Sequence, residues 1–437
     1  MHADLCIVGA GAAGLTLAHT LRGSGLDVLV LESGPVHDPD RWNAGEVTGH
    51  EYNGLLHGRV RGLGGTTAVW PGQCIRLRPA DLDAWPFDLD PFYRRAEELL
   101  GIPAGETARD PWELFGEPPL GVDTALSVFC RRKRLAELDL GSARVLTGAV
   151  ATRVESGRVE VRDTSGRGVE VEADVVVLAA GTIETLRLLL LSGIDGTGRG
   201  FEDHAFADIA RVVGPPRPLQ DTYGMRMRNG LRYYAKPIVG SCMPNIVFRY
   251  NPRSPTETLL RVRRTRRAGA RDVVRMLCGA HELAAGAARI ARGREPAPTP
   301  TDTRILAVVG QPDPQGTLTL ADELDPLGIP RARIDWRLGE PERTAIATAL
   351  DALGDALHYS VDPEPWLADE RWLEHAYDSF HPAGGARIGD IVDDDLHVRG
   401  VTGVYVCGAA AFPRAGCVNP TLTIVALAFR LADHLRT

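Results

Sequence analysis

Lysine is nearly absent from this sequence of 437 residues, because Lys133 and Lys236 are the only lysines among 49 basic residues. Arginine supplies the other positive charges, and 57 acidic residues outweigh them to give a net charge of −8. Binding nucleic acid requires a basic face, so this balance argues against a nucleic-acid partner. No apolar run approaches the roughly 18 uninterrupted residues of a membrane-spanning helix, so no transmembrane segment is expected.

Paired cysteine motifs are also missing. No two of the seven cysteines have the Cys-x-x-Cys spacing, which argues against redox dithiols and ordinary zinc sites, and we expect no bound metal. An odd number of cysteines scattered through apolar segments is typical of reduced thiols. No basic and apolar leader precedes the first apolar strand, so we expect a cytoplasmic protein. The cysteines are Cys6, Cys74, Cys130, Cys242, Cys278, Cys407 and Cys417.

The first 32 residues have the pattern of a βαβ nucleotide-binding unit. Its parts are a strand at 5–8, the glycines Gly9, Gly11 and Gly14, a helix at 12–22, a second strand at 28–31 and Glu32. In this pattern the first glycine makes a tight turn, the second lets the backbone approach a pyrophosphate, and the third lets helix and strand pack closely. Glu32 stands where a carboxylate binds ribose hydroxyls. The unit therefore predicts a bound dinucleotide.

Three further glycine-rich elements favour FAD over a nicotinamide cofactor. They are residues 61–67, residues 179–182 after an apolar strand at 173–178, and residues 408–410 after a strand at 403–407. A nicotinamide dehydrogenase usually completes its cofactor site within one contiguous domain. FAD is long enough to be contacted from several strand ends spread along the whole chain.

The sequence resembles the glucose–methanol–choline (GMC) family of flavin oxidoreductases. The resemblance is carried by residues 9–32, 62–70, 85–87, 179–193, 200–204, 316–336 and 381–428, and it is strongest in the last of these. That segment holds a His-Pro-Ala-Gly-Gly turn from His381 and an Asn-Pro-Thr sequence from Asn419. The resemblance implies that both side chains face the flavin ring.

The chemistry of alcohol oxidation explains this pair. A hydride leaves carbon for the flavin, and a proton leaves oxygen for a base of pKa near 7, which suits the imidazole of His381. Asn419 then holds the substrate oxygen without titrating. From the ordinary histidine pKa of about 6.5, flavin reduction should accelerate as pH rises through that value. His204 lies in a family segment near the cofactor, and we interpret it as structural.

The resemblance also implies a set of cofactor-binding residues. They are Gly9, Gly11, Ala12, Ala13, Gly14, Glu32, Ser33, Arg61, Gly64, Gly65, Thr66, Thr67, Val150, Ala180, Gly181, Gly408, Ala409, Asn419, Pro420 and Thr421. Some family members link FAD covalently to a histidine after the second glycine-rich turn. Residues 66–70 contain no histidine, so non-covalent FAD is expected. Ala409 follows Gly408 at a position where many FAD folds have an acidic residue. The alanine removes one polar contact that this acidic residue would make with the cofactor.

The expected fold is α/β: an FAD-binding Rossmann-like domain of the GMC type with an inserted α+β substrate domain on an antiparallel sheet. We assign residues 1–208 and 379–437 to the first and 209–378 to the second. Within the second, residues 317–320 and 333–336 predict antiparallel strands, with an amphipathic helix at 340–358 over them. Residues 259–290 predict one or two helices rich in arginine, within a basic segment at about 259–294. That segment is a solvated hairpin or a peripheral contact with an anionic surface or protein acceptor.

The function expected is FAD-dependent oxidation of a small-molecule alcohol to a carbonyl, on a sugar, cyclitol or glycosylated natural product. Oxygen or another electron acceptor would reoxidise the flavin. The alternatives are a redox-neutral lyase on the same fold and a flavoprotein monooxygenase. The latter needs NAD(P)H, and the sequence has no second GxGxxG turn to bind it. A non-catalytic flavin-binding module would not need His381 beside Asn419.

Overall fold

The predicted βαβ unit is confirmed in the computed structural model, which describes residues 1–116 and 121–436. Strand β1 (His2–Val8) leads through the glycine turn to helix α1 (Ala12–Thr20), and the chain returns in β2 (Val28–Glu32). β1 and β2 are parallel. The helix ends two residues earlier than predicted, and the first strand begins three residues earlier.

The unit belongs to a seven-stranded sheet whose parallel part has the order β6-β2-β1-β9-β20. Strands β7 and β8 extend it by antiparallel pairing to the first half of β9. Because the parallel strands end at one edge, the turns that follow β1, β9 and β20 meet there. The bounds are β6 Arg144–Thr147, β7 Ala149–Glu155, β8 Arg158–Asp163, β9 Gly168–Leu178 and β20 Val404–Val406.

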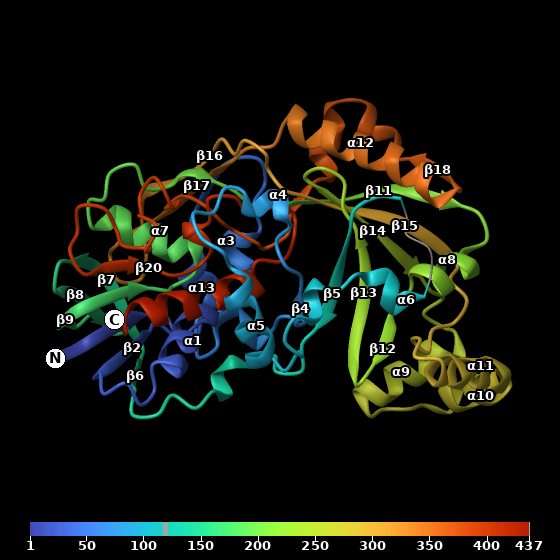
Figure 1. Cartoon of the computed structure of the whole chain (residues 1–437), viewed down its shortest axis with the longest axis horizontal. Helices are drawn as coiled ribbons and strands as arrows, with labels where there is room; N and C mark the ends of the chain where they lie inside the picture. The colour runs from blue at the N-terminus through green and yellow to red at the C-terminus, as the bar shows by residue number, and fades with distance from the viewer. Residues whose placement is uncertain (117–120, 437) are drawn as a thin grey trace.

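The two ends of the chain pack together. Helix α13 (Thr421–His434), near the C-terminus, lies beside α1 and α5 (Asp90–Leu99), as Figure 1 shows. Its apolar side is buried from Leu422 to Ala432. Helix α7 (Thr182–Leu191) follows β9 and packs against β7, β16 and β17. Packing therefore brings the first and last motifs of the sequence to one sheet edge.

The antiparallel pairing predicted for residues 317–320 and 333–336 is confirmed, because β16 (Gly316–Leu324) pairs with β17 (Pro330–Trp336). They belong to a four-stranded sheet with β3 (Glu46–Gly49) and β10 (Arg199–Phe201). The placement of the following helix over these strands was wrong. Helix α12 (Glu340–Leu357) lies mainly over a different sheet, formed by β14, β15, β11 and β18.

Two more antiparallel sheets form the other half of the molecule (Figure 1). The five-stranded sheet under α12 contains β11 Ala205–Val213, β14 Cys242–Arg249, β15 Asp302–Val309, β18 Ser360–Pro363 and β19 Tyr377–Asp378. The four-stranded sheet contains β4 Gln73–Cys74, β5 Thr124–Phe129, β12 Arg226–Arg228 and β13 Leu231–Pro237. The mixture of a parallel Rossmann-like sheet with antiparallel sheets confirms the expected fold class.

The arginine-rich segment is helical as predicted, but it forms three helices rather than one or two. They are α9 (Pro255–Thr265), α10 (Ala270–Cys278) and α11 (Ala280–Ala291). Arg266 ends α9 in a left-handed conformation, and Gly279 separates α10 from α11. A Cβ on Gly279 would lie 2.0 Å from Pro255, so glycine is required at this junction.

The remaining α-helices of the described chain are short, namely α2 Pro39–Asn43, α3 Gly54–His57, α4 Pro79–Leu82, α6 Pro111–Phe115 and α8 Pro216–Tyr223. One continuous apolar core runs through the parallel sheet and its covering helices into the antiparallel sheets. Among the described residues, no helix combines the length and apolar character needed to span a bilayer.

Candidate active site

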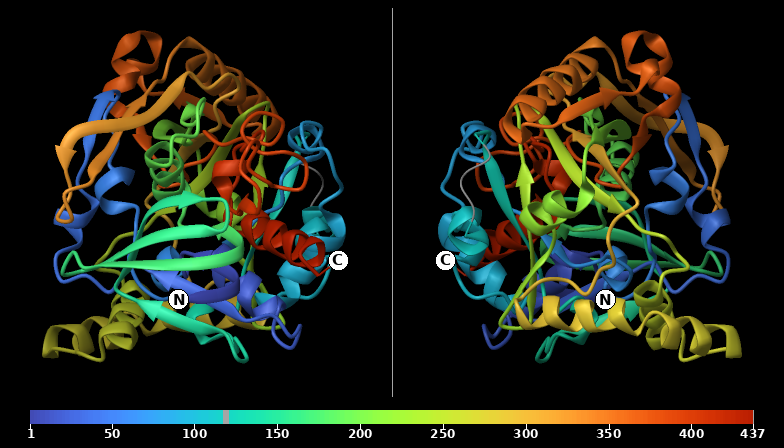
Figure 2. Two further views of the ribbon diagram at one scale, coloured as in Figure 1. Left: turned by 90° about the vertical axis from the view of Figure 1, so that its left-hand side faces the viewer. Right: turned by 90° about the vertical axis from the view of Figure 1, so that its right-hand side faces the viewer.

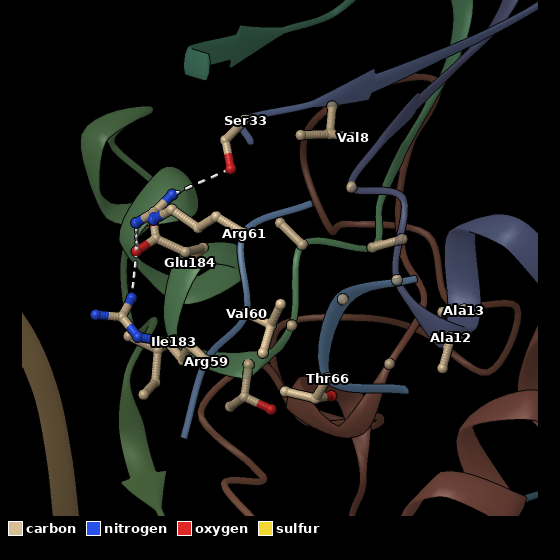
Figure 3. A pocket seen from close by; sticks show the side chains of 18 of the residues that line it. Val8, Ala12, Ala13, Ser33, Arg59, Val60, Arg61, Thr66, Ile183 and Glu184 are labelled. Atoms are coloured by element: carbon tan, nitrogen blue, oxygen red, sulfur yellow. Dashed lines mark hydrogen bonds and ion pairs between the residues drawn. The ribbon is translucent and has the colours of Figure 1, made fainter. Parts of the chain in front are cut away.

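A large cavity opens where the glycine turns meet (Figure 3). It contains about 1430 Å³ of space free of protein atoms, part of it open to solvent. Its walls come from the ends of β1, β2 and β9, from β7, from the turn after β20 and from the loop at residues 58–66. Residues from both ends of the chain and from the segment around His381 therefore line one space.

Close backbone contacts explain the glycines of the first turn. Gly9 has φ +109° and a Cβ there would lie 2.5 Å from the Ala179 carbonyl oxygen. A Cβ on Gly14 would lie 2.0 Å from the Gly9 carbonyl oxygen. The second glycine-rich turn packs on the first, since Gly64 N–H donates to the Ala10 carbonyl at 2.8 Å. Any larger side chain at Gly9 or Gly14 would displace the turn from the sheet edge.

Other glycines leave the space that a dinucleotide requires. At Gly11, Gly181 and Gly408, a Cβ would meet no protein atom within 4 Å, and all three residues line the cavity. The N-termini of α1, α7 and α13 also reach this wall through Ala12, Thr182 and other residues. Helix N-termini present free backbone N–H groups to anions, so the cavity fits the pyrophosphate of a dinucleotide.

Glu32 lies at the cavity wall, at the end of β2. Its Oε2 accepts the Ala10 N–H at 3.0 Å, and its Oε1 accepts the Gly34 N–H at 2.8 Å. The carboxylate is thus fixed by backbone donors from two sides. A fixed acceptor at the tip of the second strand matches the position at which ribose hydroxyls bind in dinucleotide folds.

A buried ionic cluster forms the neighbouring wall, drawn in part in Figure 3. Arg59 and Arg61 both contact Glu184 Oε1, the second at 2.7 Å, and Arg61 also donates to Ser33 Oγ at 3.2 Å. Arg187 contacts Glu184 Oε2 at 3.3 Å and Asp325 at 2.7 Å. Although burial opposes it, the three guanidinium groups hold the pKa of Glu184 well below its ordinary value. Three arginines and two carboxylates leave one positive charge at this wall.

His381 and Asn419 are brought together although 38 residues separate them. Asn419 Nδ2 lies 3.1 Å from His381 Nε2. Because an amide nitrogen only donates, this contact leaves Nε2 as the acceptor and places the proton of the neutral ring on Nδ1. His381 Nδ1 faces Ser379 Oγ at 2.9 Å and His204 Nδ1 at 3.2 Å. The basic nitrogen of His381 therefore points to the side occupied by Asn419.

Asp203 anchors the backbone at His381. The His381 N–H lies 2.9 and 3.0 Å from the two carboxylate oxygens of Asp203, and Tyr52 donates to the same carboxylate at 2.8 Å. The preceding residue, Phe380, has φ +61°, which is strained for an aromatic residue. The carboxylate holds the chain where this turn would otherwise relax. Burial and the neighbouring Asp378 raise the pKa of Asp203 to about 7.

His204 contacts the candidate base, which its interpretation as a structural residue did not anticipate. The two imidazole rings meet edge to face, with their centroids 5.2 Å apart. Burial lowers the pKa of His381 to about 4, so the ring is neutral at neutral pH. Burial, assisted by His381, also holds the pKa of His204 well below its ordinary value. Both rings are thus available for neutral hydrogen bonding.

The structure places most predicted site residues on the cavity wall. These are Gly9, Gly11, Ala12, Ala13, Glu32, Ser33, Arg61, Gly65, Thr66, Val150, Ala180, Gly181, His381, Gly408, Ala409, Pro420 and Thr421. Four others stand behind it. Gly14, Gly64 and Thr67 support the glycine turns, and Asn419 reaches the site through His381. Ala409 contributes its carbonyl, which accepts the Gly384 N–H at 3.0 Å.

Sequence reasoning missed the residues whose partners are distant in the chain. Arg59, Glu184 and Arg187 were not identified, nor were Asp203 and the contact with His204. Glu184 sits in the first turn of the helix after β9, where an acidic residue is common whatever its function. Two signals were available, because residues 179–193, which contain Glu184 and Arg187, and the Glu-Asp-His sequence at 202–204 both matched family segments.

Comparisons with known proteins find related domains, relatives and folds. A GMC oxidoreductase domain matches residues 312–428, and an NAD(P)-binding Rossmann-like domain matches residues 7–37. The fructose dehydrogenase large subunit of Gluconobacter japonicus is 24% identical, with 100% of this chain and 98% of that protein covered. The C-glycoside 3-oxidase of Microbacterium trichothecenolyticum is 28% identical over 85% of this chain and 75% of that protein. Pyridoxine 4-oxidase from Mesorbium loti has a similar fold, with a TM-score of 0.61, 16% identity and coverage of 99% and 98%.

A Rossmann-like sheet, a dinucleotide cavity and these matches define an FAD-dependent oxidoreductase. More particularly, residues 312–428 match the GMC oxidoreductase domain, and relatives aligned over nearly the whole chain are named as GMC-type oxidoreductases.

Proposed function

We propose that this protein oxidises an alcohol to a carbonyl compound, with His381 as the base and Asn419 as the group that holds the substrate oxygen. The observation that carries the proposal is the 3.1 Å contact between His381 Nε2 and Asn419 Nδ2, at a cavity lined by the dinucleotide-binding glycines. A substrate hydroxyl that replaces this contact can give its hydrogen to the Nε2 lone pair and accept the amide N–H on its oxygen at the same time.

In the proposed mechanism, bound FAD supplies the acceptor for the hydride that leaves the alcohol carbon. Asn419 donates a hydrogen bond to the alcohol oxygen and orients it. His381 Nε2 accepts the hydroxyl proton as the carbon–oxygen double bond forms. Asp203 keeps the ring in place through the backbone amide of His381. Because the His381 ring is neutral at neutral pH, it is ready to accept that proton.

The substrate class that we propose is a hydroxyl group on a sugar, cyclitol or glycosylated compound. Two relatives are named as a fructose dehydrogenase subunit and a C-glycoside 3-oxidase, which supports this class. Oxygen or another electron acceptor then reoxidises the flavin. The segments assigned to cofactor and substrate, 1–208 with 379–437 and 209–378, remain a proposal.

Replacement of His381 tests the mechanism. We expect His381→Ala to retain FAD and to slow flavin reduction by the alcohol about 100-fold or more, since general-base catalysis is typically worth that much. Asn419→Ala should also slow reduction. Rapid-mixing absorbance under anaerobic conditions measures both, first with a panel of sugars and cyclitols to find the substrate. Admission of air then shows whether oxygen is the acceptor.

The pH dependence separates the two roles. With the pKa of His381 lowered to about 4, the wild-type rate should stay constant through neutral pH and fall only in acid, unlike the expectation from the ordinary histidine value. Asn419→Ala should retain this profile, whereas His381→Ala should lose it. The exposed His281 provides a matched control in His281→Ala. A His381→Ala enzyme that bleaches at the wild-type rate would show that another group is the base.

We further propose that FAD is held without a covalent bond, because residues 66–70 contain no histidine. Acid precipitation of the yellow protein should release all of the colour into the supernatant. Colour that remains with the pellet would contradict the proposal.

A further inference from the structure

The basic helical segment, defined here as residues 255–294, has the opposite charge to the rest of the molecule. It contains ten arginines against three acidic residues, whereas the whole chain has a net charge of −8. In Figure 2 its helices project from one lower corner of the molecule, beyond the sheets. Figure 1 places them at the opposite end from α1 and β2, which border the cavity. The segment is therefore a separate surface.

Helix α10 turns its apolar side toward solvent. Val273, Val274 and Leu277 are 45%, 59% and 71% exposed, and they share one side of the helix by their spacing. The opposite side is half-buried and includes Asp272, whose carboxylate lies 2.5 Å from a guanidinium nitrogen of Arg261 on α9. An ordinary surface helix buries its apolar side and exposes its charges, so α10 has the reverse arrangement.

Arginines without counter-ions lie on the adjoining helix α9, in the turn that follows it and in the first turn of α10. Within the described residues, the side chains of Arg263, Arg264, Arg266, Arg267 and Arg271 form no ion pair, and all are exposed. The neighbouring helices add more exposed apolar groups, namely Leu259 on α9 and Ile290 on α11. The surface thus combines apolar side chains with unneutralised positive charge.

We propose that the basic helical segment docks on an anionic lipid bilayer, with Val273, Val274 and Leu277 entering the interface and the adjoining arginines contacting lipid headgroups. Peripheral membrane helices have this composition, because apolar burial and attraction to anionic headgroups act together. A second copy of the chain would bring the same positive charges together, which opposes self-association. Nucleic acid is disfavoured because residues 255–294 contain no phenylalanine, tyrosine or tryptophan on which a base could stack.

Vesicle sedimentation tests the proposal with the whole FAD-loaded chain. We expect wild-type protein to sediment with vesicles of equal parts phosphatidylcholine and phosphatidylglycerol and to stay in solution with phosphatidylcholine alone. Binding should weaken in about 1 M salt, where the Debye length shrinks to about 3 Å. Replacing Arg263, Arg264, Arg266 and Arg267 with glutamine should lower the partition coefficient at least about tenfold, since each basic residue near such a surface contributes appreciably.

The apolar contribution requires its own variant. Val273→Ser, Val274→Ser and Leu277→Ser together should also lower partitioning at least about tenfold, and Leu277→Ser alone should act in the same direction if the triple variant folds poorly. Matched controls are Leu324→Ser, at an exposed leucine of β16, and glutamine at Arg94, Arg167, Arg211 and Arg371, all exposed outside the segment. These controls should bind as wild type does.

Three results would overturn the proposal. Wild-type protein could remain in the supernatant with anionic vesicles at low salt, which would leave an acidic protein as the better partner. The serine variant could bind anionic vesicles as tightly as wild type, which would remove the apolar side from the contact. Sedimentation velocity could show self-association that the serine variant abolishes, which would assign the surface to a second copy. The flavin spectrum reports folding in every case, independently of activity.

Discussion

Two groups of arginines in this molecule differ in almost every respect except their chemistry. Arg59, Arg61 and Arg187 are buried around Glu184 at the cavity wall. The arginines at the end of α9 are exposed, and Arg263 and Arg264 have no acidic partner among the described residues. The buried group is fixed by short ion pairs, so its function is to shape a wall. The exposed group has no such partner within the described residues, so its positive field extends into solvent over about 8 Å at physiological salt.

Removing the shared carboxylate should give the largest effect in this comparison. Glu184→Gln leaves Arg59 and Arg61 buried without their anion, and breaking a buried pair in this way typically costs about 3–5 kcal/mol. We expect a lower free energy of unfolding and weaker FAD retention, measured by urea unfolding and by flavin content after gel filtration. By contrast, neutralising Arg263, Arg264, Arg266 and Arg267 should change stability by less than about 1 kcal/mol and leave flavin reduction intact.

Equal losses in the two variants would show that the exposed arginines also support the fold. A large loss of flavin reduction in the surface variant would place α9 over the substrate.

An effect of similar size, but dependent on pH, is expected at the buried carboxyl group of Asp203. Its pKa is raised to about 7 from an ordinary 3.8, so the folded state retains a proton that the unfolded state releases. The free energy of unfolding should therefore fall as pH rises from the ordinary pKa of Asp203 to its raised pKa. The loss is about 1.4 kcal/mol for each pH unit between those two pKa values. Asp203→Asn removes this dependence, and its stability relative to wild type should increase from pH 4 to pH 7. Urea unfolding across pH measures the difference.

His381 should give the opposite slope. Its pKa is lowered to about 4, so the unfolded state binds a proton more readily below pH 6.5, and stability falls as pH decreases through that window. The same unfolding series on His381→Ala should show a smaller loss of stability in acid than wild type shows.

For the Asp203 prediction, the contradicting result is a parallel pH dependence of stability in wild type and Asp203→Asn. It would show that Asp203 is already ionised in the folded protein.

The sequence was sufficient wherever the required contacts lie within one short stretch of chain. The β1-α1-β2 unit, its glycine turn and Glu32 are specified by spacing, because strand, turn and helix each have a local signature. The pattern also predicted the helical arginine segment, but not its division into three. Gly269 and Gly279 were visible in the sequence, yet a glycine within an apolar pattern does not by itself end a helix.

Tertiary structure decided what depends on partners far apart in the chain. The spacing from His381 to Asn419 suggested a pair, but the Nε2–Nδ2 contact and the burial that lowers the pKa of His381 come from packing. The same holds for Glu184, whose ordinary position in a helix gives no indication that Arg59 and Arg61 reach it. Composition revealed how many arginines the chain contains. Only the fold determines which of them are neutralised, because a charge is paired by its neighbours in space and not by those in sequence.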